Sequence, residues 1–169
     1  YLILCWLLSA FLMDFSPYMA LMKFSGATGC GKTTAARLLS ILIYGDEHLG
    51  DPSTAAAFSI SSQNPLLVID NLEARDMTKS IEKFLLLAAT KGSKEKRAGG
   101  TETDTIQESP RSLVLITAIE PFEKAETINR TYDIEFFGKK KLVFFFDNFS
   151  IFLKLNGLFI NFDFTPYLF

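Results

Sequence analysis

The sequence has few of the residues that build disulfide frameworks or zinc centres. It contains two cysteines and one histidine among 169 residues. Cys5 lies in an apolar stretch and Cys30 in a glycine-rich one, an arrangement that suits neither a disulfide framework nor a zinc site. His48 has no second ligand at a recognisable spacing, so we expect it to face solvent. Unpaired cysteines fit a reducing compartment, and we expect a cytoplasmic protein.

The chain also lacks an excess of positive charge and a long apolar run. Its 17 basic and 19 acidic residues give a net charge of -2, so any nucleic-acid contact must come from a local patch or from assembly. The apolar residues 1–13 have no basic flank and fall short of the roughly 20 residues that span a membrane. We expect a buried helix there, ended by Asp14 and Pro17, and no membrane association. Because the first residue is Tyr1 rather than Met, we expect a piece of a longer protein.

Residues 26–33 read GATGCGKT and match the phosphate-binding pattern G-x-x-x-x-G-K-[ST]. In such a loop the backbone N–H groups surround a polyphosphate, Lys32 reaches the β- and γ-phosphates, and the Thr33 hydroxyl binds Mg²⁺. The apolar run Met19–Phe24 before the loop and the Ala- and Leu-rich segment 33–44 after it predict the required strand, loop and helix. The alternative is a glycine-rich turn without a ligand. The predicted ATP-binding residues are Gly26, Ala27, Thr28, Gly29, Cys30, Gly31, Lys32, Thr33 and Thr34.

A second motif begins at Leu66, where four large apolar residues precede Asp70. This pattern is typical of a buried parallel strand that presents a carboxylate at its end, as a Walker B strand does. Asp70 would then share the Mg²⁺ with Thr33, whereas the alternative is an Asp that caps the next helix. Many ATPases place Glu after this Asp as the catalytic base, but here the residue is Asn71. Asn71 could position the attacking water, and Glu73 is the nearest carboxylate that could assist.

Two more segments complete the predicted sheet. Leu113–Thr117 is another buried-strand run, and as a parallel neighbour it would place Thr117 beside Asp70, although Thr117 could also be an ordinary strand terminus. Arg130 precedes the strand-like residues 133–137, and its guanidinium suits the charge on a transferring phosphoryl group. The alternative is a surface arginine paired with Glu126 or Asp133. We predict an α/β fold, with helices on both faces of a mainly parallel central sheet.

From about Tyr18 to Phe137 the motifs FSGATGCGKTT, LLVIDN, LVLITAIEPF and INRTYDIEF stand in a specific order. Together they resemble the P-loop ATPase module of AAA+ and superfamily 3 helicase-like proteins of phages and mobile elements, often joined to primase domains. The resemblance implies a P-loop three-layer sandwich and a ring-forming ATPase that acts on DNA during replication. It also implies that Thr117 is a sensor contacting the γ-phosphate or its attacking water, and that Arg130 is an arginine finger acting on a neighbouring subunit.

A basic, glycine-containing segment separates the two apolar runs that end in Asp70 and Thr117. In superfamily 3 helicases a hairpin at this point touches DNA in the central channel, and lysines on a flexible tip suit that contact. The alternative is a solvated loop. The predicted DNA-binding residues are Lys91, Lys94, Lys96 and Arg97.

Composition divides the chain into an apolar helix over 1–17, an ATPase core over 18–138 and a tail over 139–169. The tail holds nine of the 17 phenylalanines and shows no functional motif. We favour a truncated or abnormal end, with a terminal hairpin and a membrane-associating tail as alternatives. Segment 45–63 carries only a weak strand or helix signal, so an edge strand of the sheet is expected to be missing or short.

The predicted function is a helicase-like ATPase that binds and hydrolyses ATP with Mg²⁺. Two alternatives remain open: a slow nucleotide-dependent switch or assembly ATPase, and a small-molecule kinase. A kinase would need an acceptor pocket and a basic lid.

Overall fold

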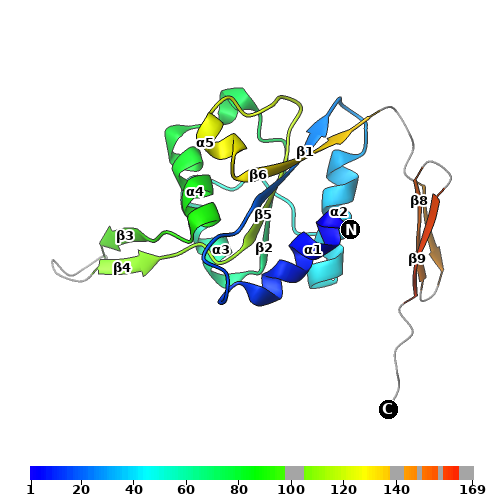
Figure 1. The fold of residues 1–169 in the computed structure, drawn as a ribbon, viewed down its shortest axis with the longest axis horizontal. Coiled ribbons are helices and arrows are strands. Elements are labelled where there is room, and N and C mark those ends of the chain that lie inside the picture. The colour runs from blue at the N-terminus through cyan, green and yellow to red at the C-terminus, as the bar shows by residue number, and fades with distance from the viewer. Residues whose placement is uncertain (98–104, 138–142, 148–149, 156–157, 164–169) are drawn as a thin grey trace, which may run out of the picture.

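The computed structural model describes residues 1–97, 105–137, 143–147, 150–155 and 158–163 (Figure 1). Its core is a four-stranded sheet in the order β2-β5-β1-β6, and all neighbouring strands are parallel. The strands are β1 (Leu21–Gly26), β2 (Leu66–Ile69), β5 (Leu113–Thr117) and β6 (Thr131–Phe136). The predicted α/β class and parallel sheet are therefore confirmed.

Alternating side chains along the strands separate two apolar clusters, one on each face of the sheet. On one face, Leu21 and Ile116 pack with Phe58 of α3 (Thr54–Gln63) and Phe84 of α4 (Lys79–Thr90). On the other face, Met22 and Leu115 belong to the cluster that contains residues of α1 (Leu2–Leu8) and α2 (Lys32–Tyr44). This arrangement is compatible with a three-layer sandwich, because each face of the sheet is covered by helices.

The apolar N-terminal segment is helical but only partly buried, so the prediction of a buried helix over residues 1–13 is confirmed for the helix and wrong for the burial of its whole surface. Helix α1 is followed by the short 3-10 helix η1 (Ser9–Leu12). Trp6 is buried and its indole Nε1 donates to the carbonyl of Ala20 at 2.7 Å, but Phe11 and Phe15 are exposed. An apolar run longer than its packing surface leaves one side uncovered. No helix in the described ranges is long and apolar enough to cross a membrane.

The outer edge of β2 has almost no strand partner, as the weak signal over 45–63 predicted. Only Gly50 forms a bridge, with Ile69, and its carbonyl accepts from the backbone N of Asp70 at 3.0 Å. The Tyr44 hydroxyl satisfies the backbone at the start of β2. It accepts from the backbone N of Leu66 at 2.9 Å and donates to the Leu66 carbonyl. Burial raises the pKa of the Tyr44 phenol, which keeps that donor protonated.

The basic segment after α4 forms a β-hairpin. Strands β3 (Lys94–Arg97) and β4 (Thr105–Glu108) pair antiparallel, with Lys94 opposite Glu108. Figure 1 shows the hairpin projecting away from the sheet at the end where α4 finishes. The side chains of residues 94–97 lie outside the described part, so their contact with DNA remains a prediction.

The phenylalanine-rich tail forms a three-stranded antiparallel sheet in the order β7-β8-β9. Its strands are β7 (Val143–Asp147), β8 (Ser150–Leu155) and β9 (Leu158–Asp163). The backbone therefore adopts more regular structure than the terminal hairpin that the sequence suggested. Residues 138–142, 148–149, 156–157 and 164–169 of this region lie outside the described residues.

Candidate nucleotide-binding site

The glycines of the loop between β1 and α2 adopt backbone conformations that other residues avoid. Gly26, Gly29 and Gly31 have φ angles of 134°, 78° and 102°. A side chain at Gly26 would also collide with the carbonyl oxygen of Phe136 on the neighbouring strand. The loop then leads directly into α2, whose first backbone N–H groups have no partner inside the helix and suit an anion. Left-handed glycines and free N–H groups at a helix start are the backbone features that the predicted phosphate binding would need.

Lys32 is folded over this loop. Its Nζ donates to the carbonyls of Gly26 at 2.6 Å and Ala27 at 3.0 Å, and lies 3.8 Å from Cys30 Sγ. The residue is only 9% exposed, so the ammonium is held inside the curve of the loop. A phosphate seated on the loop would meet a cation that the protein has already positioned.

Asp70 joins the loop to the centre of the sheet. Its Oδ1 accepts from Thr33 Oγ1 at 3.0 Å and from Thr117 Oγ1 at 2.5 Å. Both donors approach it because β5 lies between β1 and β2, so the carboxyl ends of all three strands meet at one edge. The three side chains that the sequence assigned to separate motifs therefore form one cluster.

Thr117 contacts Asp70 rather than the phosphate loop. The residue is 1% exposed, its hydroxyl proton is directed at Asp70, and its oxygen accepts from the backbone N of Asn71 at 2.8 Å. A threonine hydroxyl has a single proton to donate. In this arrangement Thr117 orients Asp70 and Asn71, so the predicted direct contact with a γ-phosphate or water would require that proton to be redirected.

Asn71 has a structural reason to be asparagine. Its φ angle is 59°, in the left-handed region that Asn tolerates better than residues with longer side chains. The turn is held by Asn71 N on Thr117 Oγ1 and by Leu72 N on the Thr117 carbonyl at 2.9 Å. A glutamate at this position would carry a conformational penalty, which is a structural reason for an asparagine after Asp70.

Glu73 is buried, with 5% of its surface exposed. Its carboxylate accepts from the backbone N of Ile119 at 3.0 and 3.1 Å and from that of Glu120 at 3.3 Å. These bonds tie the turn after β2 to the segment after β5. The geometry favours a positioning role for Glu73 over that of a catalytic base, because both oxygens already hold backbone donors.

A polar cluster beside the loop was missed at the sequence level. Lys23 on β1 is 1% exposed, and its Nζ donates to Asp133 Oδ2 on β6 at 2.8 Å and lies 4.8 Å from the centre of the Phe122 ring. Ser25 Oγ donates to the other oxygen of Asp133 at 2.5 Å. The available signal was a lone lysine inside the apolar run that feeds the phosphate loop, since a buried lysine needs a partner.

Arg130 lies at the amino ends of the core strands, whereas the loop lies at their carboxyl ends. Its carbonyl accepts from the backbone N of Leu21 at the start of β1, and the six residues of β1 separate it from the loop by about 17 Å. Its guanidinium is 3.3 Å from Glu126 Oε1, which is one of the pairings that the sequence left open. Arg130 therefore cannot act on the phosphate loop of its own chain, and a role across a subunit interface stays a prediction.

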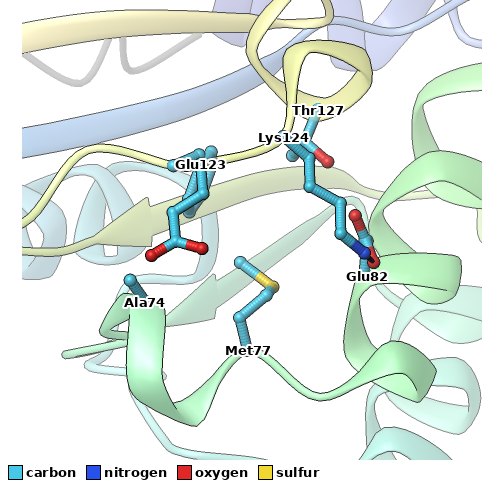
Figure 2. Close-up of a pocket in the computed structure, with 7 residues that line it drawn as sticks. Ala74, Met77, Glu82, Glu123, Lys124 and Thr127 are labelled. Atoms are coloured by element: carbon cyan, nitrogen blue, oxygen red, sulfur yellow. Dashed lines mark hydrogen bonds and ion pairs between the residues drawn. The ribbon is translucent and has the colours of Figure 1, made fainter.

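A small cavity of about 70 Å³ adjoins the site, between η2 (Ala74–Asp76), α4 and α5 (Ala125–Ile128). Figure 2 shows Lys124 extending toward Glu82, with which it forms an ion pair, and Glu123 directed toward Ala74. Thr127 Oγ1 is buried there and has no hydrogen-bond partner in the described residues. The space suits a few water molecules and is too small for a kinase acceptor.

The donor set fits the predicted Mg²⁺ site. A hydroxyl from Thr33 and a carboxylate from Asp70 are hard oxygen ligands, and Mg²⁺ is often held by one or two such groups together with substrate phosphates. Among the described residues no group of three His, Cys, Asp or Glu side chains could hold a metal by itself. The two cysteines are also unpaired, as predicted.

No protein-family model matches the chain, and a comparison with curated proteins finds no match.

Proposed function

We propose that the chain binds ATP with Mg²⁺ on the loop Gly26–Thr33 and hydrolyses it. The observation that carries the proposal is the contact of 3.0 Å between Thr33 and Asp70. It joins the loop pattern to the second motif, 37 residues further along the chain. A glycine-rich turn that binds nothing needs no such partner.

In the proposed site each residue has a distinct task. Lys32 binds the β- and γ-phosphates, and Thr33 and Asp70 hold the Mg²⁺, which when bound would neutralise charge on the phosphate oxygens. Thr117 orients Asp70. Asn71 positions the attacking water through its amide, and the absence of a glutamate there favours slow turnover of an isolated chain.

The decisive test is ATP affinity, measured by titration calorimetry on the whole chain. Lys32→Ala removes a charge-assisted contact with phosphate and is expected to weaken ATP binding about tenfold to a hundredfold. Lys83→Ala, which removes an exposed lysine from α4, is the matched control and should bind as the wild type does. Equal affinity of the Lys32 variant and the control would refute the proposal.

We further propose that the ATPase works as a helicase-like motor on DNA in the replication of a mobile element, as a homo-oligomeric ring. What supports this is the hairpin β3–β4, which lies at the point in the chain where superfamily 3 helicases carry one. Arg130 is also too far from the phosphate loop of its own chain to act there, as an arginine finger for a neighbouring subunit would be. ATP turnover with and without single-stranded DNA tests the coupling, with particle mass measured in each state. Stimulation together with a larger particle supports the motor, whereas slow turnover unaffected by DNA supports a switch or assembly ATPase.

A kinase is the second candidate, because one groove is large enough for an acceptor. This groove of about 520 Å³ runs along the outer edge of β2, between Tyr44, His48 and Ile60. Strand β5 separates that edge from the loop strand β1, a gap of about 10 Å, and none of the lining residues is Lys or Arg. Both facts make direct phosphoryl transfer into the groove unfavourable. Turnover that requires an added metabolite would reverse this ranking.

A further inference from the structure

A second groove lies at the amino ends of the core strands, whereas the phosphate loop lies at their carboxyl ends. It has a volume of about 260 Å³ and is lined by residues that include Tyr18, Ala20, Ala89, Asn129, Arg130 and Tyr132. Leu21 N bonds to the Arg130 carbonyl at this edge, so the groove lies beyond the starts of β1 and β6. Of the residues assigned to the proposed ATPase, Arg130, which is proposed to act on a neighbouring subunit, lines this groove, and no residue of the phosphate loop does.

The groove combines an apolar floor with exposed aromatic rings. Ala89 is 2% exposed and Met19 6%, whereas Tyr18 is 70% exposed and Tyr132 49% exposed. Flat, rigid and accessible aromatic rings that line a small groove suit another flat ring. Bases of single-stranded nucleic acid stack on such side chains with little dependence on sequence.

The groove also adjoins the base of the basic hairpin. Met19 N donates to the carbonyl of Ala89 at 2.9 Å, and α4 ends one residue later at Thr90. Lys91 caps that helix, and β3 starts at Lys94. A strand of nucleic acid lying along the hairpin would reach the groove directly, because both are at the same end of the sheet (Figure 1).

The local charge favours a polyanion, but modestly. Arg130 lines the groove, although its pairing with Glu126 at 3.3 Å offsets part of its charge. Lys91 adds a further positive charge at the end of α4, and the sequence of β3, KEKR, holds three basic residues and one acidic residue. Phosphate attraction would therefore come from the hairpin side, and the groove itself would contribute contacts with bases.

We propose that the groove lined by Tyr18 and Tyr132 binds single-stranded nucleic acid by stacking its bases on the two tyrosine rings, with Lys91 near enough to contact its phosphates. This inference rests on the DNA-linked part of the proposed function and adds the site at which bases are held. It does not depend on ATP binding, because the groove and the phosphate loop lie at opposite edges.

The test separates base contacts from phosphate contacts with two probes. One is an oligodeoxyadenylate of about 20 nucleotides, and the other is an abasic strand of the same length that keeps every phosphate. Binding of fluorescently labelled strands is measured by anisotropy without nucleotide, on the whole chain. The wild type is expected to prefer the base-containing strand by about fivefold to a hundredfold.

The variants Tyr18→Leu and Tyr132→Leu keep apolar bulk but remove the aromatic face. Each is expected to reduce the ratio of affinities for the base-containing and the abasic strand by at least about threefold, while binding of the abasic strand stays unchanged. Tyr18→Phe and Tyr132→Phe keep the face and should bind as the wild type does. Phe11→Leu, which alters an exposed ring outside the groove, is the matched control.

Three results would overturn the inference. The first is equal binding of the two strands by the wild type, and the second is an equal loss for both strands in the leucine variants. The third is a leucine variant whose particle mass in light scattering differs from that of the wild type while its binding of both strands is unchanged. That result would make the groove a contact between copies of the chain. ATP affinity, measured in parallel, reports separately on the proposed ATPase site.

Discussion

The polar residues at the two ends of the parallel core strands differ in how exposed they are. At the carboxyl edge, Thr117 is 1% exposed and forms a closed set of bonds with Asp70 and Asn71. At the amino edge, Arg130 forms an exposed pair with Glu126, and the rings of Tyr18 and Tyr132 face solvent. The polar groups at the carboxyl ends of the strands are therefore bonded to one another, as a preformed site for a small ligand would need. Those at the amino ends are accessible, as the proposed contact with a large partner would need.

The largest effect is expected at Gly26, which links the loop to the sheet. Gly26→Ala places a methyl group against the Phe136 carbonyl at a φ of 134°, so we expect a loss of about 2 to 4 kcal/mol in the free energy of unfolding. ATP binding should be lost as well. Chemical denaturation measures the first effect.

Gly50→Ala is the matched control for this change, since nothing lies within 4 Å of a side chain there. It should shift stability by less than about 0.5 kcal/mol. Equal effects on stability at the two glycines would show that the close approach of β1 and β6 does not restrict which residue is tolerated at position 26.

The next effect concerns the Lys23–Asp133 pair behind the loop. Asp133→Ala leaves the Lys23 ammonium buried without a counter-charge, and we expect a loss of about 2 to 3 kcal/mol in the free energy of unfolding. The value lies below that of a fully buried pair because the Asp133 side chain is 44% exposed.

Lys23→Met should destabilise by only about 1 kcal/mol or less, since it removes the buried charge and leaves a half-exposed carboxylate that water can solvate. Thermal unfolding of both variants tests this asymmetry. A reversed order would mean that Asp133, rather than Lys23, is the group that needs its partner.

A smaller effect is expected at the left-handed residue after Asp70. Asn71→Glu restores the residue that many ATPases carry, but at a φ of 59° it should lower stability by about 1 to 2 kcal/mol. Asn71→Gly should be neutral or slightly stabilising, because glycine adopts this conformation freely. Turnover assays on both variants show whether the amide contributes. A glutamate variant that is as stable as the wild type and hydrolyses ATP faster would contradict the structural explanation for Asn71.

The smallest effect on the single chain is expected at Arg130. Arg130→Ala removes an exposed i,i+4 pair and should change stability by about 0.5 kcal/mol or less. If Arg130 serves a neighbouring subunit, mixing this variant with Lys32→Ala should restore part of the ATPase activity that each lacks alone. Absence of rescue, with both variants assembled, would leave Arg130 as a surface residue.

Much of the core and its site could be predicted because the signals are local. The glycine spacing of residues 26–33 defines a loop whatever the rest of the chain does. Three apolar runs and the strand-like residues 133–137 marked the four core strands. The start of β1 was predicted two residues early, at Met19, because Met19 N bonds to Ala89 rather than to a strand. That bond depends on α4, which lies far away in the sequence.

The burial of charged residues could not be predicted in the same way. The buried pair of Lys23 was missed although this lysine stands inside an apolar run, and Glu73 was considered as a base although its carboxylate accepts from the backbone N–H groups of Ile119 and Glu120. Phe11 was expected inside and is exposed. Hydropathy along the chain reports what can be buried, but the available packing surface decides what is buried.

The sequence by itself determined the phosphate-loop pattern, the four strands and the carboxylate that ends the second of them. These are short-range properties, set by glycine spacing and by the length of apolar runs. Only the tertiary structure decided that β5 lies between β1 and β2, that Thr117 bonds to Asp70, and that Arg130 lies at the other edge of the sheet. The physical reason is that these relations join residues up to 110 positions apart, as Lys23 and Asp133 are. Contacts of that separation arise from packing of the whole sheet.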